Sequence, residues 1–145
     1  MLTTDQKGAL AETAIMHAAI KSGAGVYKRV MEGGRYDVVL DAGSELLRVQ
    51  CKWAPRNGDV MSVRCYSCRR AREGLRKRVY TAAEVDVIAA YCQDVNRCFL
   101  LTAEQFDGRH ALQLRLSPCR TSHRLGINWA EDVAFDARLR ALVGP

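Results

Sequence analysis

Two apolar segments joined by a short Ala-Gly-Ser turn, residues 35–41 and 45–53, constrain the fold most strongly. A turn of this composition between two such segments predicts an antiparallel hairpin. Gln50 and Lys52 are two residues apart, so they point to the same face of their strand. A four-residue connection places Asp37 directly opposite Gln50, and a two-residue connection keeps it on that face, whereas a three-residue connection moves it to the other face. The turn geometry therefore decides whether three polar side chains meet.

Helix and strand patterns flank this hairpin on both sides. Thr3 and Gln6 form a capping box that opens a helix, which ends before Gly23. A C-terminal helix is predicted to begin at Asn128 and to bury a stripe that includes Phe135. The other predicted strands are 25–31, 60–66, 85–92, 98–101 and 111–116. No repeat or long linker divides the chain, so residues 1–145 are predicted to form one α/β (α+β) domain.

The positive charge of the chain is concentrated in one segment. The net charge is +6, yet outside residues 64–78 acidic and basic residues balance. Within the segment only Glu73 opposes seven basic residues: Arg64, Arg69, Arg70, Arg72, Arg76, Lys77 and Arg78. A basic cluster of this kind is typical of a surface that binds a polyanion such as nucleic acid. The alternative is a merely solvated face in an arginine-rich chain.

The cysteines and histidines do not form a recognisable metal-binding pattern. Cys65 and Cys68 have the spacing of half a zinc site, but no second pair follows, so we expect no bound zinc. Three histidines, His17, His110 and His123, are scattered, although His123 could contact phosphate. Disulfides are not expected, because the sequence begins without the pattern of a signal peptide. No apolar run approaches the roughly 18–20 residues of a membrane span, so no membrane association and a cytoplasmic location are expected.

Asp37, Gln50 and Lys52 together suit phosphodiester hydrolysis. A carboxylate and an amide oxygen are ligands for a hard cation such as Mg²⁺. The cation polarises the phosphate and activates water, and a lysine can position that water and stabilise charge on phosphorus. The alternative is a surface hairpin in which Asp37 and Lys52 form an ion pair. Asp41 and Asp86 are weaker candidates, since Asp41 is suited to ending its strand at the turn and Asp86 to a structural pair.

The sequence resembles the PD-(D/E)XK nuclease superfamily through Tyr36-Asp37 and Gln50-Cys51-Lys52. More narrowly it is similar to the small homing-endonuclease branch that carries Gln at the second acidic position. The resemblance also covers Gly8-x-x-x-Glu12, Glu84-Val85-Asp86 and the segment 126–130, and so spans nearly the whole chain. It implies a restriction-endonuclease-like core, a central mixed β-sheet flanked by helices.

The resemblance also implies roles for individual residues. Asp37 would bind the metal, Mg²⁺ or Mn²⁺, and Lys52 would be the catalytic lysine. Gln50 would stand at the second acidic position, and Cys51 would offer its backbone carbonyl to the metal. Glu12 would reach the site from the first helix and could replace the charge that Gln50 lacks.

The predicted function is that of a metal-dependent endonuclease that cuts double-stranded DNA, with site specificity of the homing-endonuclease kind. Cutting both strands calls for two active sites, which suggests a homodimer or homotetramer. Two alternatives stay open at this point. One is a junction-resolving or repair nuclease of the same fold, and the other is an inactive DNA-binding module in which Gln50 marks a decayed site.

Overall fold

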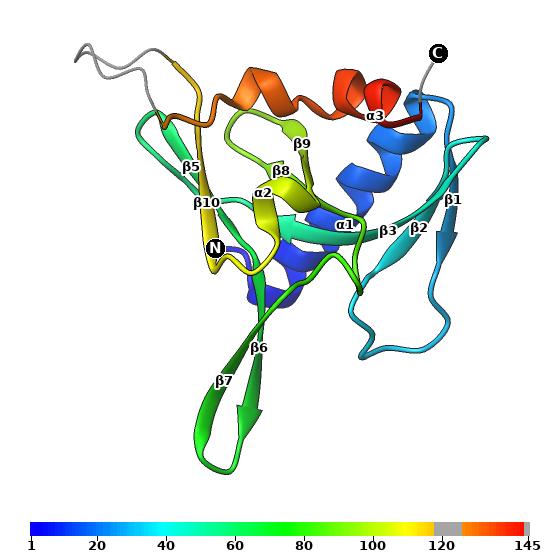
Figure 1. Cartoon of the computed structure of the whole chain (residues 1–145). Helices are drawn as coiled ribbons and strands as arrows, with labels where there is room; N and C mark the ends of the chain where they lie inside the picture. Colours follow the sequence, from blue (N-terminus) through cyan, green and yellow to red (C-terminus); the bar gives the residue numbers. More distant parts are fainter. Residues whose placement is uncertain (118–125, 144–145) are drawn as a thin grey trace.

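The computed structural model describes residues 1–117 and 126–143, and its central feature is a five-stranded sheet (Figure 1). The strand order is β1-β2-β3-β8-β9. Its members are β1 (Gly25–Lys28), β2 (Val38–Asp41), β3 (Leu46–Trp53), β8 (Val87–Cys92) and β9 (Arg97–Thr102). All neighbouring pairs are antiparallel except β3 and β8, which are parallel, so the sheet is mixed as predicted.

Two smaller sheets and four helical segments complete the described chain. The three-stranded sheet contains β10 (Ala111–Arg115), β5 (Val60–Arg64) and β4 (Arg56–Asn57). A separate two-stranded ribbon, β6 (Tyr66–Ala71) with β7 (Gly74–Val79), projects from the body of the molecule (Figure 1). The helical segments are α1 (Thr4–Lys21), α2 (Ala103–Phe106), η1 (Ala130–Val133) and α3 (Phe135–Val143). This is the predicted α+β class, and no helix in the described ranges is long and apolar enough to span a membrane.

Both faces of the central sheet are buried, which explains the almost continuous apolar sequence of β8. On one face Ile15 of α1 packs in a cluster with Val49 of β3 and Leu139 of α3. On the other face Ile88 of β8 belongs to a second cluster, which includes Phe106 of α2 and residues of β5 and β10. Alternate residues of β3 therefore face different environments, so Gln50 and Lys52 lie on the face opposite α1.

The β2–β3 hairpin has the four-residue connection that was one of the predicted possibilities. Val38 pairs with Val49, and Asp41 pairs with Leu46. The Ala42 N–H donates to the Glu45 carbonyl at 3.0 Å and closes the turn. This register puts Asp37 at the start of the hairpin, one residue before β2, where its N–H donates to the Val49 carbonyl. The common face of Asp37 with Gln50 and Lys52 stays a prediction.

The capping box that opens α1 is also confirmed. The Thr3 hydroxyl accepts a hydrogen bond from the Gln6 N–H at 3.1 Å, and the Gln6 side chain accepts one from the Thr3 N–H at 2.9 Å. Two backbone donors at the helix start are thereby satisfied.

Three local predictions were wrong. The strand predicted at 25–31 ends at Lys28, and the strand predicted at 35–41 begins only at Val38, so a long loop joins β1 to β2. The basic segment forms the β6–β7 ribbon, which the sequence pattern does not predict. The C-terminal segment is not one helix, because Ala134 has extended backbone (φ −54°, ψ 132°) and forms a bridge with Phe99 at the sheet edge, separating η1 from α3.

Candidate active site

Asp37 lies immediately before β2 and is bonded to β3 through both its backbone and its side chain. Its N–H donates to the Val49 carbonyl at 2.8 Å, and its carboxylate accepts from the Cys51 N–H at 2.9 Å. Burial raises the pKa of the Asp37 carboxyl above its ordinary value, the Cys51 hydrogen bond opposes this, and the negative charge of Glu12 adds to the rise. The site therefore holds a carboxylate whose negative charge is poorly compensated by the protein.

Gln50 and Lys52 extend from the same face of β3 into different surroundings. Gln50 is only 8% exposed, and its side-chain amide donates to the Cys51 carbonyl at 3.3 Å. The Lys52 ammonium donates to the Tyr66 carbonyl at 3.0 Å and lies 4.9 Å from the centre of the Tyr80 ring. Burial lowers the pKa of Lys52. The structure thus does not contain the Asp37–Lys52 ion pair of a solvated hairpin.

Glu12 approaches Asp37 from α1. The two carboxylates line one cavity of about 270 Å³, together with Lys28, Arg29 and Tyr36. The Oε1 atom of Glu12 is buried and makes no hydrogen bond of regular geometry, although the Lys28 Nζ lies 2.9 Å from it. A buried carboxylate oxygen held by charge alone is costly unless a cation is near.

The donor set at this place fits a divalent cation that prefers oxygen. Glu12 and Asp37 supply two carboxylates to the cavity, while the Gln50 amide and the Cys51 carbonyl are neutral oxygens on the adjacent strand β3. In the described part of the chain no three His, Cys, Asp or Glu side chains are grouped closely enough to hold a metal. Any cation here would therefore rely on two acidic residues and on neutral oxygens. The Cys51 thiol is an unsuitable ligand, because burial strongly raises its pKa.

The basic residues of the predicted nucleic-acid surface gather on the ribbon and its flanks, and all are exposed. Arg64 ends β5, and Arg72 lies in the turn between β6 and β7; the others are Arg69 and Arg70 on β6 and Arg76, Lys77 and Arg78 on β7. Arg69 and Arg76 are direct cross-strand partners. Like charges placed opposite each other destabilise a ribbon, and Arg76 is partly compensated by its ion pair with Glu73 at 3.1 Å.

The base of the ribbon is connected to the hairpin that carries the candidate residues. Arg35 donates to the Ser67 hydroxyl at 2.7 Å and to the Val79 carbonyl at 2.6 Å, and its guanidinium lies 4.3 Å from the Tyr80 ring centre. Sequence patterns gave no signal for Arg35 or Tyr80, because these contacts join segments that are distant in the chain. The ribbon and Lys52 consequently share a rigid attachment.

The weaker candidates have structural partners or lie elsewhere. Asp86 forms an ion pair with Arg48 at 2.9 Å, and Arg48 lowers the pKa of Asp86. Asp41 ends β2 and accepts from the Gly43 N–H at 2.9 Å, as predicted for a turn residue. His110 stacks edgewise on Tyr66. His123, which could contact phosphate, lies outside the described residues.

Cys65 and Cys68 differ in their surroundings. Cys65 is buried between β5 and β6, whereas Cys68 is exposed on β6. The absence of bound zinc stays a prediction.

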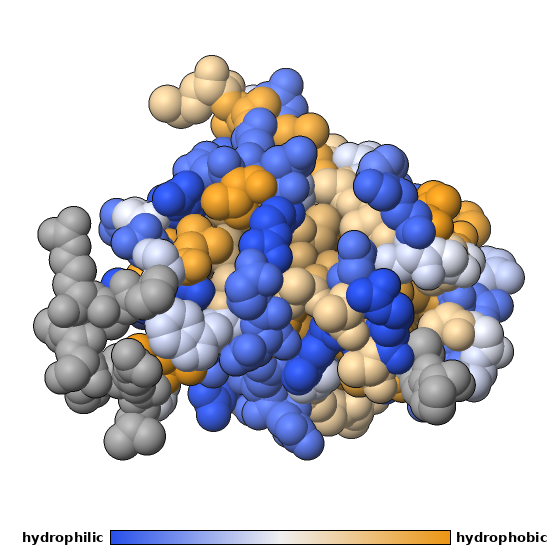
Figure 2. Space-filling model, turned by 90° about the horizontal axis from the view of Figure 1, so that it is seen from above, coloured by the Kyte–Doolittle hydropathy of each residue, from blue (hydrophilic) through white to orange (hydrophobic). Residues whose placement is uncertain are grey.

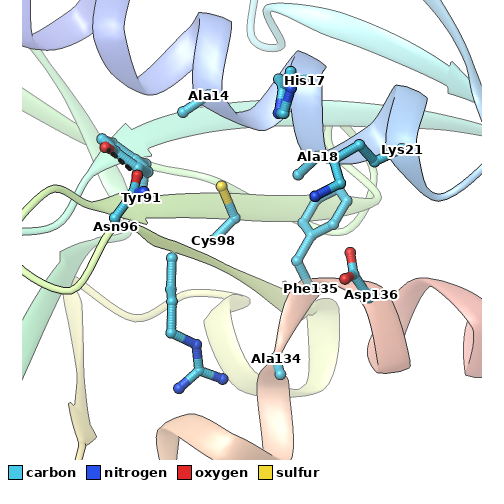
Figure 3. Close-up of a pocket in the computed structure, with 11 residues that line it drawn as sticks. Ala14, His17, Ala18, Lys21, Tyr91, Asn96, Cys98, Ala134, Phe135 and Asp136 are labelled. Atoms are coloured by element: carbon cyan, nitrogen blue, oxygen red, sulfur yellow. Dashed lines mark hydrogen bonds between the residues drawn. The ribbon is translucent and has the colours of Figure 1, made fainter.

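A second cavity, of about 440 Å³, lies between α1, α3 and the end of β8 and contains none of the candidate residues (Figure 3). His17 and Lys21 point toward it from α1, and Asp136 is the one carboxylate that lines it. Asp136 already accepts a hydrogen bond from the Ser22 hydroxyl at 2.9 Å. From the side of α3 the surface is a mixture of hydrophilic and hydrophobic residues (Figure 2). The larger cavity therefore has no donor set comparable with that of Glu12 and Asp37.

Comparison with known proteins agrees with the geometry. A model of the PD-(D/E)XK endonuclease family matches residues 2–136. Among solved structures, the bacterial homing endonuclease I-Ssp6803I superposes with a TM-score of 0.77 at 21% identity, covering 95% of this chain and 93% of that one. That likeness confirms the predicted restriction-endonuclease-like fold. No curated protein matches significantly. Since the family match covers almost the entire sequence, the chain belongs to the PD-(D/E)XK endonuclease family.

Proposed function

We propose that this endonuclease hydrolyses phosphodiester bonds in double-stranded DNA with Mg²⁺ or Mn²⁺, in the manner of a site-specific homing endonuclease. The observation that supports this most directly is the shared cavity of Glu12 and Asp37, beside the strand that carries Gln50 and Lys52. Asp37 and Glu12 would hold the cation with help from the Gln50 amide oxygen and the Cys51 carbonyl. When bound, the cation would supply charge that polarises the phosphate and favours attack by water.

Lys52 is the residue proposed to act on the reacting phosphate. Its ammonium is partly buried and is held at the Tyr66 carbonyl, so it would need to exchange that bond for one to the phosphate. In surroundings of low dielectric an ammonium stabilises developing negative charge more strongly than in water. Because burial lowers the Lys52 pKa, its Nζ also releases a proton more readily than an exposed lysine.

The ribbon is proposed to bind the DNA on which this site acts. A two-stranded ribbon can enter the major groove of DNA, and arginines on it can reach phosphates or base edges. The attachment of the ribbon base through Arg35 would then set where the bound DNA meets Lys52. Cleavage of both strands would further require a second copy of the chain, as a homodimer or homotetramer.

The proposal predicts cleavage of supercoiled plasmid only when Mg²⁺ or Mn²⁺ is present. Plasmid that carries a target site should become linear, plasmid without it should stay supercoiled, and excess chelator should stop the reaction. Gel electrophoresis of timed samples measures the three forms. Equal cutting of every plasmid, with preference for a four-way junction, would instead support a structure-specific nuclease. Binding without cleavage under all metals would support an inactive DNA-binding module.

A second prediction concerns the charge that Gln50 lacks. If Glu12 and Asp37 supply the negative charge, Glu12→Gln should weaken Mn²⁺ binding by roughly tenfold to a hundredfold and slow cleavage. Gln50→Glu adds a carboxylate beside Asp37, so it should bind Mn²⁺ at least as tightly as wild type and partly rescue Glu12→Gln. Isothermal titration of Mn²⁺ into the single and double variants measures the coupling. Strictly additive effects would show that Glu12 and Gln50 do not share a metal site.

A further inference from the structure

Lys28 makes an ion pair at the candidate metal site that neither the sequence motif nor the family assigns. It is the last residue of β1 and pairs with Val38, the neighbour of Asp37. Its Nζ lies 2.9 Å from the Oε1 atom of Glu12. The Lys28 side chain is 64% exposed, whereas that of Glu12 is 23% exposed. An exposed ammonium thus neutralises a mostly buried carboxylate.

The surroundings of this pair explain why a cation is needed there. Glu12 and Asp37 face the same cavity, and each disfavours the charge of the other. The Oε1 atom of Glu12 is buried, and the Lys28 ammonium 2.9 Å away is the cation that faces it. The hydrogen bond to Glu12, and then the charge of Glu12, raise the pKa of Lys28. Ion pairs with one exposed partner are weak and exchange easily.

We propose that Lys28 is a positioning residue that neutralises Glu12 while no metal is bound, and that it turns to a DNA phosphate when a divalent cation takes Glu12. This inference rests on the proposed metal site of Glu12 and Asp37. The long aliphatic stem of Lys28 starts at the edge of the sheet, so its ammonium can leave Glu12 without disturbing the core. Metal binding and phosphate binding would then be coupled through a single side chain.

The first test measures the affinity of the protein for Mn²⁺ in the absence of DNA. Lys28→Gln removes the competing ammonium, so Mn²⁺ should bind about fivefold more tightly by isothermal titration. Arg29→Gln is the matched control, because Arg29 lines the same cavity and carries the same charge, but its guanidinium donates to the Met31 carbonyl and acts on Asp37 only through its charge. Because it acts through charge alone, removing it should tighten Mn²⁺ binding by no more than about twofold, clearly less than Lys28→Gln. Lys28→Arg keeps the competing charge and should bind Mn²⁺ like wild type.

The second test measures DNA binding with and without Ca²⁺, on duplex checked to be intact by denaturing gel. With Ca²⁺, Lys28→Gln should flatten the slope of log K against log salt by about 0.9, the value for one phosphate contact. Without metal the slope should equal that of wild type, since Lys28 is then held by Glu12. A metal-dependent change in slope is a result that a purely structural ion pair would not give.

The outcomes separate this inference from the metal site on which it rests. If Glu12→Gln leaves Mn²⁺ affinity unchanged, the proposed metal site is wrong and the role of Lys28 fails with it. If Glu12→Gln weakens binding but Lys28→Gln and Arg29→Gln tighten it equally, the site stands and the inference is overturned, because only the net charge of the cavity matters. The inference would also be overturned if Lys28→Gln flattened the slope of log K against log salt by the same amount without metal. Circular dichroism of each variant confirms folding.

Discussion

Asp37→Asn should reduce metal-dependent DNA cleavage by about a thousandfold or more while the protein stays folded. Asparagine keeps the shape of the side chain and an oxygen that can accept the Cys51 N–H, so the β2–β3 hairpin is preserved. It removes one of the two carboxylates that face the cavity. The single-turnover rate of plasmid cleavage at saturating Mg²⁺ measures the loss.

Asp37 should also affect the stability of the metal-free fold, which can be measured without any cleavage assay. The folded-state pKa is raised above its unfolded value, so the metal-free fold favours the protonated carboxyl. This stabilising contribution is complete below the unfolded pKa of about 3.9 and is lost as the pH rises through the folded pKa. At pH 8, metal-free Asp37→Asn should therefore have a Tm equal to or above that of wild type. Mg²⁺ should raise the Tm of wild type more than that of the variant.

Asp86→Asn is the matched control for Asp37. Asp86 has its pKa lowered by Arg48, so its charged form stabilises the fold above the unfolded pKa, and that contribution is lost as the pH falls through the folded pKa. Asp86→Asn should lower the Tm at pH 8 and leave the cleavage rate of the folded enzyme nearly unchanged. Full cleavage by Asp37→Asn, or an equal loss in both variants, would contradict the role given to Asp37.

The parts of the fold that could be predicted from sequence are those with local causes. The capping box of α1 lies within three residues, and the β2–β3 register follows from a four-residue connection. Gln50 and Lys52 share a face because they are two residues apart on β3, whereas the side on which Asp37 lies depends on the connection, which spacing left open between two, three and four residues.

The parts that could not be predicted depend on contacts between distant segments. Ala134 leaves helical geometry because it bridges to Phe99, and no residue near Ala134 signals this. The Lys52 ammonium lies at the Tyr66 carbonyl because the ribbon base is attached there. Likewise the Glu12–Lys28 pair forms only once α1 and β1 are packed. Spacing gives the face on which a side chain lies, but tertiary packing decides which atom it meets.

Changing the ribbon should have the other large effect, on DNA affinity. The variant Arg69→Gln, Arg70→Gln and Arg72→Gln removes three exposed charges from β6 and the following turn. If each contacts a phosphate, the slope of log K against log salt should flatten by about 2.7, and affinity at 0.1 M salt should fall by roughly 500-fold. Fluorescence anisotropy of a labelled duplex over a salt series measures both.

The fold should tolerate this variant, because the ribbon is separate from the central sheet and none of the three side chains is buried. Removing Arg69 also relieves its repulsion with Arg76, its cross-strand partner. The matched control is Lys21→Gln, Arg97→Gln and Arg140→Gln, which removes the same charge from α1, β9 and α3. The control has the same net charge, so a general attraction between protein and DNA would weaken equally in both variants. If the slope of log K against log salt flattens more in the ribbon variant than in the control, the ribbon arginines contact DNA phosphates. Equal slopes in the two variants would show that the ribbon is solvated surface.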